Sequence, residues 1–286
     1  PVGDERVVGD ARAACAHRVA AWGLRLVHGH QLYGLCGADG YGCVVSVRIE
    51  WFDKVCVITL DRPDKRNAVD LVTLQSLRSA QHDIGQRDCR AVVLTGTPPA
   101  FCSGADLTGV EHGVFTDTLL DVLTGFGRLD CAVIAAIDGP ALGAGVQLAA
   151  GCDLRMAAPG SRFGVPAAKL GLAVDSWTVE RVGREAGWSA ARYMLLSTDT
   201  MTAEQLLGGF VHRIGSVDDA VEWAHSIAAL APLTIAAHKK ALERLGGAPI
   251  SIDEIEAARL AAWESDDAVE GRRAFLEKRS PDFRGR

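Results

Sequence analysis

Short apolar runs bounded by turn residues recur along this chain, and the clearest set lies between residues 132 and 157. Runs this short, separated by Gly and Pro, favour strands and turns over one long helix. The pattern predicts, in order, a buried strand, a Gly-Pro turn, a Gly-Ala-Gly bend, a short apolar helix and a second strand, at Ala132–Ile137, Gly139–Pro140, Gly143–Gly145, about Val146–Cys152 and about Leu154–Ala157. Backbone can approach a ligand closely at such a bend, because glycine has no side chain and the first helical N–H groups are unpaired.

Strands and helices also alternate before this stretch. The pattern predicts two paired strands, a helix capped by Asp70, a further strand and a further helix, at Val44–Glu50, Val55–Asp61, about 71–84, Ala91–Thr95 and Thr116–Arg128. This alternation indicates an α/β fold built of repeated units.

Helices dominate the remainder of the chain. They are predicted at Ser176–Ala186 and Ser189–Leu196, and a third is expected to begin at Thr202, before a short strand at Val211–Ile214. From Val217 onward the pattern is nearly all helical, with stops at Pro232 and Gly246–Gly247.

Composition and charge narrow the function classes. The chain has 286 residues, enough for a sizeable core, with a net charge of −6. The charge argues against a nucleic-acid binder held by phosphate contacts. The longest apolar stretch is interrupted by residues 138–140, so no membrane span is expected. Eight cysteines without any C-x-x-C pair indicate reduced, mostly buried thiols in a cytoplasmic protein and no metal site.

Two turns of small residues follow predicted strands, Ser103–Gly104–Ala105 and Gly143–Ala144–Gly145. If both strands belong to one sheet, the N–H groups of Ala105 and Ala144 could converge on one oxygen. Two such donors form an oxyanion hole, and each is worth about 3 kcal/mol to a reaction through an enolate or tetrahedral oxyanion. The alternative is that both are tight turns between buried elements.

An ordered set of motifs resembles the crotonase (enoyl-CoA hydratase/isomerase) superfamily over about residues 46–286. The matching motifs are Arg62–Pro63 with Asn67–Ala68, Phe101–Asp106, Ile137–Gly145, Cys152–Asp153, Phe163–Pro166, and Phe275 with Glu277–Arg279. The resemblance implies a spiral of ββα units in residues 46–231 and a C-terminal helical trimerisation region in residues 232–286. Residues 1–45 are an N-terminal extension to which the sequence assigns no role.

The resemblance also implies an acyl-CoA ligand and no tightly bound cofactor. The thioester oxygen would lie between Ala105 and Ala144. Lys65, Arg66 and Ala68 would line the CoA, and Asp106 and Leu107 would offer backbone near its adenine.

A neighbouring subunit of a homotrimer, or of a hexamer made of two trimers, would bring its own residues to the same CoA. The residues implied are Phe275 and Lys278. For Lys65, Arg66 and Lys278 the alternative is a solvated surface position, although CoA phosphates do require cations.

Two departures from the family pattern bear on the reaction. Gln147 and Ala167 stand where hydratases of the family carry two glutamates. An amide cannot take a proton at neutral pH, and an alanine side chain cannot act as an acid or a base. A general acid or base typically raises the reaction rate by about 10²- to 10⁴-fold. The usual hydratase activity is therefore expected to be weak or absent.

Asp175 is a carboxylate that could compensate. Other members of the family use one at this point as a base or nucleophile, but Asp175 can equally be the N-cap of the helix that follows. Trp177 could wall an acyl pocket or pack in the core. Asp153 and Arg155 are expected to form a buried pair.

The sequence therefore leaves two hypotheses open. The first is an acyl-CoA-binding enoyl-CoA hydratase/isomerase family enzyme of fatty-acid metabolism, a lyase or isomerase with non-standard acid–base residues. The second is a non-catalytic acyl-CoA carrier or sensor that still binds CoA but has lost the chemistry.

Overall fold

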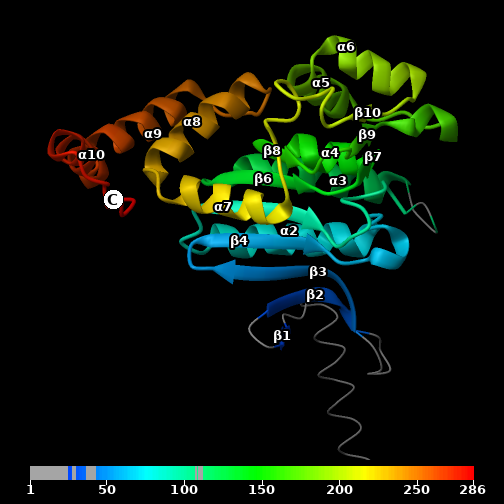
Figure 1. Cartoon of the computed structure of the whole chain (residues 1–286), viewed down its shortest axis with the longest axis horizontal. Coiled ribbons are helices and arrows are strands. Elements are labelled where there is room, and N and C mark those ends of the chain that lie inside the picture. The colour runs from blue at the N-terminus through cyan, green and yellow to red at the C-terminus, as the bar shows by residue number, and fades with distance from the viewer. Residues whose placement is uncertain (1–24, 28–29, 37–42, 107, 109–111) are drawn as a thin grey trace, which may run out of the picture.

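The computed structural model describes residues 25–27, 30–36, 43–106, 108 and 112–286 (Figure 1). Most of the predicted N-terminal extension, and Leu107 of the predicted site, lie outside these ranges. Within them the strands form a sheet of eight and a second sheet of three.

The larger sheet begins antiparallel and becomes parallel. Its strands lie in the order β1, β2, β3, β4, β5, β6, β8, β11, with antiparallel pairing up to β4 and parallel pairing from β4 onward. These strands span Arg25–Val27, His30–Cys36, Cys43–Phe52, Val55–Leu60, Ala91–Gly96, Ala132–Ile137, Leu154–Ala157 and Arg213–Ile214. β1 and β2 extend the edge of this sheet beyond the predicted strand pair.

The second sheet consists of β7 (Pro140–Leu142), β9 (Arg162–Gly164) and β10 (Met201–Thr202). The Gly-Pro segment predicted as a turn therefore continues into a strand. Together with isolated bridges from Cys102 to Ala141 and from Val69 to Ala105, this sheet forms a second layer of short strands. The arrangement gives the expected ββα units, each with one strand in the large sheet and a short second-layer segment before its helix.

Helices cover both faces of the large sheet (Figure 1). The main core packs α2, α3 and α4 against one face, and α7 covers the other with Ala220 and Ala224 beside Val55 and Val93. These helices span Leu71–Gly85, His112–Arg128, Ala144–Gly151 and Val217–Ala228. Burial of each larger apolar side chain is worth about 1.5–3 kcal/mol, so the two-sided burial of β4, β5 and β6 anchors the fold.

Local signals account for several boundaries. α2 begins at its predicted cap, where Asp70 accepts the Thr73 N–H at 2.8 Å. α5 spans Ser176–Ala186 as predicted, with Asp175 as its N-cap. The helix predicted from Thr202 is wrong, because residues 203–206 form only a turn after β10. The Thr202 hydroxyl does cap that turn, 3.4 Å from the Gln205 N–H.

The C-terminal part is helical as predicted, with α8 (Pro232–Leu245), α9 (Ile252–Glu264) and α10 (Asp266–Glu277). These helices lie at one end of the molecule, and α5 and the short α6 (Trp188–Arg192) lie at the other (Figure 1). In the described residues no single helix is long and apolar enough to cross a membrane. Together, α7 and α8 are long and apolar enough to span a membrane, but the pair bends by 108° at the break between the two helices.

Candidate functional site

The two turns of small residues lie side by side, where β5 and β6 end. The Cys102 N–H donates to the Pro140 carbonyl at 3.2 Å, and the Leu142 N–H donates back to the Cys102 carbonyl at 2.9 Å. A Cβ on Gly145 would lie 2.3 Å from the Cys102 carbonyl oxygen. This close approach of two backbones explains why glycine is needed at position 145.

Each turn presents an unused N–H group. The Gly104 carbonyl and the Asp106 N–H are both bonded to Val69, at 2.9 and 2.8 Å, but in the described part of the chain the Ala105 N–H has no acceptor. The Ala144 N–H likewise has none among the described residues, because Ala144 is the first residue of α4. Gly143 caps this helix with φ of 51°, a conformation that glycine adopts readily. The two donors thus lie on adjacent turns, with the positive end of α4 behind one of them.

Charged side chains organise the loop beside these turns. Arg62 forms ion pairs with Asp70 at 2.9 Å and Asp106 at 3.1 Å, and donates to the Ala68 carbonyl. Hydrogen bonds from Thr108, and then the Arg62 guanidinium, lower the pKa of Asp106. Arg62 was not among the predicted site residues, and its pairing with Asp106, 44 positions away, could not be inferred from its motif.

The predicted cations of this loop point toward solvent. Lys65 is exposed, with its Nζ 4.0 Å from Asp106 Oδ2. Arg66 is also exposed, and its guanidinium forms no hydrogen bond or ion pair with the residues that the structure describes. Asn67 is buried behind them, where it accepts the Arg62 N–H at 2.9 Å and donates to the Thr97 and Ala100 carbonyls at 2.7 Å each. The loop is therefore rigid at its base while its cations remain available.

Gln147 and Asp175 come together through a residue that sequence reasoning missed. The buried Gln147 amide donates to Thr178 Oγ1 at 2.6 Å, and lies 3.4 Å from Asp175 Oδ2. Thr178 also donates its N–H and its hydroxyl to the two Asp175 oxygens, at 2.9 and 2.8 Å. The N-cap interpretation of Asp175 is confirmed. The sequence could have indicated this role of Thr178, because the residue three positions after an N-cap aspartate donates its N–H to that aspartate.

The remaining predicted residues lie in two places. Ala167 and Trp177 are half-buried and pack against the main core. Phe275 and Lys278 are exposed at the end of α10, which lies far from α4 in the same chain (Figure 1). The structure therefore does not bring these last two to the turns of their own chain.

The expected Asp153–Arg155 pair is wrong. Arg155 is fully buried and pairs with Glu185 at 2.5 Å, while it also donates to the Ala149 and Cys152 carbonyls at 3.2 and 2.8 Å. Asp153 instead binds the Lys239 ammonium at 2.7 Å. The two side chains are separated because their partners come from different helices, α5 and α8.

A second arginine holds the same end of α4. Arg181 donates to the Ala150 carbonyl at 2.9 Å, and pairs with Glu243 of α8 at 2.9 Å. With Arg155 it satisfies carbonyls that the end of a helix leaves unpaired, and it places positive charge where the helix dipole is negative. The carboxyl end of α4 is thus fixed to α5 and α8, which also fixes the position of Ala144 at its amino end.

Comparison with known proteins identifies the family. A family model described as enoyl-CoA hydratase/isomerase matches residues 51–286. The chain belongs to the enoyl-CoA hydratase/isomerase family. Its fold is accordingly the crotonase fold, with ββα units and C-terminal helices, and the family binds acyl-CoA thioesters.

Individual proteins similar to this chain are also named as enoyl-CoA hydratases. It is 41% identical over 239 residues to the probable enoyl-CoA hydratase echA6 of Mycobacterium tuberculosis, covering 82% of this chain and 97% of that one. It is 33% identical over 251 residues to the 2,3-dehydroadipyl-CoA hydratase of Escherichia coli, covering 82% and 96%. The crystal structure of an enoyl-CoA hydratase/carnithine racemase from Magnetospirillum magneticum matches with a TM-score of 0.77 and 30% identity, covering 84% and 96%.

A metal centre has no support in the described residues, where no group of three or more His, Cys, Asp or Glu side chains could hold an ion. Burial raises the pKa of the Cys102 and Cys152 thiols to about 12 each. Both thiols are therefore protonated at neutral pH and are poor nucleophiles.

Proposed function

We propose that this protein binds acyl-CoA thioesters, with the thioester oxygen accepting hydrogen bonds from the N–H groups of Ala105 and Ala144. The observation that carries this proposal is the pair of unused N–H groups on two turns that contact each other. Two such donors stabilise an enolate oxygen by about 3 kcal/mol each, because they are already oriented before charge develops.

We propose further that hydration of enoyl-CoA is weak or absent. The support is the resemblance of the motifs, by which Gln147 and Ala167 match the positions of the two glutamates in hydratases of the family. The Gln147 amide is also engaged, because its Nε2 donates to Thr178. Neither side chain can activate water or protonate carbon, which are the two proton transfers that hydration requires.

Asp175 is the carboxylate available for other proton transfers, such as isomerisation through an enolate. It is exposed, and its oxygens lie on the helix cap beside Gln147. If it acts as the base, Asp175→Asn abolishes thioester isomerisation while leaving acyl-CoA affinity unchanged, and unchanged turnover would exclude it.

For CoA itself we propose contacts from Lys65, Arg66 and Ala68, with backbone near Asp106 and Leu107 beside the adenine. The exposure of both cations supports this, as does the lack of a hydrogen bond or ion pair from the Arg66 guanidinium to any described residue. Phe275, which is 82% exposed, and Lys278 would reach the CoA of a neighbouring subunit in a trimer or hexamer. Exposed apolar side chains along α8, α9 and α10 support such an assembly, at Leu242, Leu245, Leu260, Trp263 and Leu276.

The test of the oxyanion proposal is Ala144→Pro. Proline is tolerated at the first helical position and removes one N–H group. Calorimetry with an acyl-CoA and turnover of a panel of enoyl-CoA and dienoyl-CoA thioesters should both weaken, with a rate loss of about 10²-fold or more. The matched control is Ile252→Pro, at the exposed first position of α9, and it should behave as wild type. Equal rates and affinities for Ala144→Pro and wild type would refute the proposed hole.

The second candidate function is a non-catalytic acyl-CoA carrier or sensor. It is favoured by the engagement of both Gln147 and Asp175 in the cap of α5. Micromolar binding of acyl-CoA without turnover of any thioester in the panel would support it. Hydration of crotonyl-CoA at rates typical of the family would contradict both the carrier and the weak hydratase.

A further inference from the structure

The first turn of α4 presents the Gln147 side chain on the same face as Ala144. These two residues are 5% and 4% exposed. The other residues of α4 except its glycines are 0% exposed, namely Val146, Leu148, Ala149 and Ala150. Residues three positions apart lie on one face of a helix, about 4.5 Å apart along its axis. The small opening along α4 is therefore at the face that Ala144 and Gln147 share.

Hydrogen bonding fixes which end of the Gln147 amide faces this opening. An ionised carboxylate can only accept, so the Thr178 hydroxyl uses its single hydrogen on Asp175 Oδ2, at 2.8 Å. The Thr178 oxygen then accepts from Gln147 Nε2 at 2.6 Å. A reversed amide would place Gln147 Oε1 against the oxygens of Thr178 and Asp175 with no hydrogen between them. The nitrogen of the amide therefore faces α5, and its oxygen faces away.

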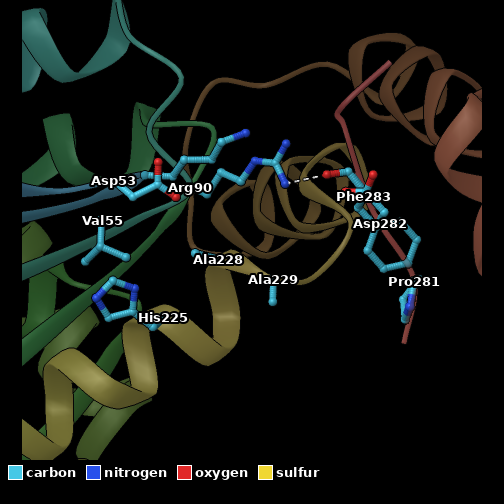
Figure 2. Close-up of a pocket in the computed structure, with 10 residues that line it drawn as sticks. Asp53, Val55, Arg90, His225, Ala228, Ala229, Pro281, Asp282 and Phe283 are labelled. Carbon is cyan, nitrogen blue, oxygen red and sulfur yellow. Dashed lines mark hydrogen bonds between the residues drawn. The ribbon is translucent and has the colours of Figure 1, made fainter. Parts of the chain in front are cut away.

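Gln147 Oε1 accepts no hydrogen bond from the described residues. In the part of the chain that the structure describes, fully buried side-chain nitrogen or oxygen atoms without a hydrogen-bond partner occur only in Arg90. Arg90 lies elsewhere, beside Phe283, whose carbonyl accepts from its Nη1 at 2.8 Å (Figure 2). Gln147 Oε1 is thus not fully buried and reaches the opening beside Ala144. A nearly enclosed acceptor without a donor favours a ligand that supplies one.

We propose that Gln147 Oε1 accepts a hydrogen bond from a hydroxyl group at C3 of the bound acyl chain, with Thr178 as the positioning residue that orients the amide. This inference rests on the proposed binding of acyl-CoA thioesters, and it names a feature of the acyl group that the site selects by affinity, without turnover. C3 is two bonds from the thioester carbonyl carbon, so its hydroxyl lies within about one helical turn, 5.4 Å, of an oxygen bound to the Ala144 N–H. Helical side chains lean toward the amino end of their helix, which brings the Gln147 amide toward that oxygen.

Calorimetric titration with a matched pair of thioesters tests the proposal. 3-Hydroxybutanoyl-CoA and 3-methylbutanoyl-CoA differ only in a hydroxyl in place of a methyl group, so they share the CoA, the thioester and the shape of the chain. The two enantiomers of the hydroxy ester are titrated separately, because a fixed acceptor favours one of them. We expect that enantiomer to bind about five- to tenfold more tightly than 3-methylbutanoyl-CoA, as one neutral hydrogen bond allows.

The outcomes separate this inference from the proposed function. Binding of all three esters with affinities within about twofold of one another would overturn the inference and leave the proposed acyl-CoA binding in place. Absence of binding by all three would overturn both.

Two variants assign the preference to Gln147 and Thr178. Gln147→Leu removes the acceptor at similar volume, and should reduce the ratio of the two affinities to about one. A ratio that stays at the wild-type value would assign the hydroxyl to another acceptor, such as Asp175, and overturn the proposal. Thr178→Val removes the hydroxyl that orients the amide and should also lower the ratio, whereas Thr178→Ser should restore it. This second variant decides the matter if Gln147→Leu does not fold.

Thr73→Val is the matched control. Thr73 donates its N–H and its hydroxyl to Asp70, the N-cap of α2, at 2.8 Å each, as Thr178 does to the N-cap of α5. Because both esters carry the same CoA, Thr73→Val should leave the ratio of their affinities at the wild-type value. Equal falls of the ratio in Thr73→Val and Thr178→Val would reject Thr178 as the positioning residue.

Discussion

Lys239 connects the C-terminal helices to the sheet, and replacing it with methionine tests how much this connection stabilises the fold. Its side chain is 6% exposed, and its ammonium donates to the Phe126 and Cys131 carbonyls at 2.8 Å each and to Asp153 at 2.7 Å. All three donors of the ammonium are thus satisfied, by the end of α3, the segment before β6 and the segment before β8.

Lys239→Met should lower the free energy of unfolding, because it leaves the Asp153 carboxylate without its ion-pair partner. Breaking a buried ion pair by removing one partner costs about 3–5 kcal/mol, because the other charge stays buried and unpaired. Asp153 is 21% exposed and keeps a hydrogen bond from the Val133 N–H at 2.7 Å. We therefore expect the lower end of that range, about 3 kcal/mol of unfolding free energy.

Urea unfolding followed by circular dichroism measures this cost. All variants are compared at one protein concentration, because association contributes to apparent stability. The neighbouring Lys240→Met is the matched control: Lys240 is paired with Asp130, which is 73% exposed, and such a surface pair is worth about 1 kcal/mol or less. A loss of less than about 1 kcal/mol in Lys239→Met, or equal losses in the two variants, would refute the reasoning.

Three further predictions concern the site and its surroundings. Gln147→Glu should lower the thermal midpoint of unfolding at neutral pH, because a carboxylate replaces a hydrogen-bond donor beside the Asp175 carboxylate. Adding Asp175→Asn should restore part of the loss. A higher midpoint in Gln147→Glu would show that the two side chains are not in contact. Asn67→Asp should cost about 3 kcal/mol in urea unfolding, since two donated hydrogen bonds become contacts between a carboxylate and carbonyl oxygens. Burial, and then Arg155, lower the pKa of His212 from 6.5, so the neutral form is favoured in the fold. The contribution of His212 to the free energy of unfolding should therefore be present above about pH 6.5 and be lost as the pH falls below it. His212→Gln should flatten this dependence in urea midpoints measured between about pH 7.5 and 5.

Local signals in the sequence were sufficient for many elements of the fold. β8 and α5 have the predicted bounds, and the caps at Asp70 and Asp175 are where short-range chemistry puts them. The helix expected from Thr202 failed, because two glycines follow its first turn. Gly208 has a φ of 86°, and its N–H donates to the Val211 carbonyl at 2.9 Å, which turns the chain away from a helix. The strand β7 was missed, since it begins at the proline of the Gly-Pro pair and its three residues are too few to show a period-2 pattern.

For the candidate site, the sequence indicated the two backbone turns and the side chains of Gln147 and Asp175, but not the ion pairs around them. The turns at Ala105 and Ala144 were visible as small residues after apolar runs. The side-chain partners were not, because Arg155 finds Glu185 and Lys239 finds Asp153 across 30 and 86 positions of chain. Such pairings depend on how helices are placed in space, and no local pattern encodes them.

The contact between Gly145 and the Cys102 carbonyl has a consequence for how this protein could diversify. The two donors that face the proposed oxygen belong to main chain that contacts main chain directly, while Arg155 and Arg181 hold the far end of α4. Under the proposed function, substitutions at positions 147, 167 and 175 would change the groups beside the acyl chain while the backbone donors stay in place. If the proposed function holds, a new reaction could arise at this site by side-chain substitution alone, because the contact between the two backbones would still position the donors.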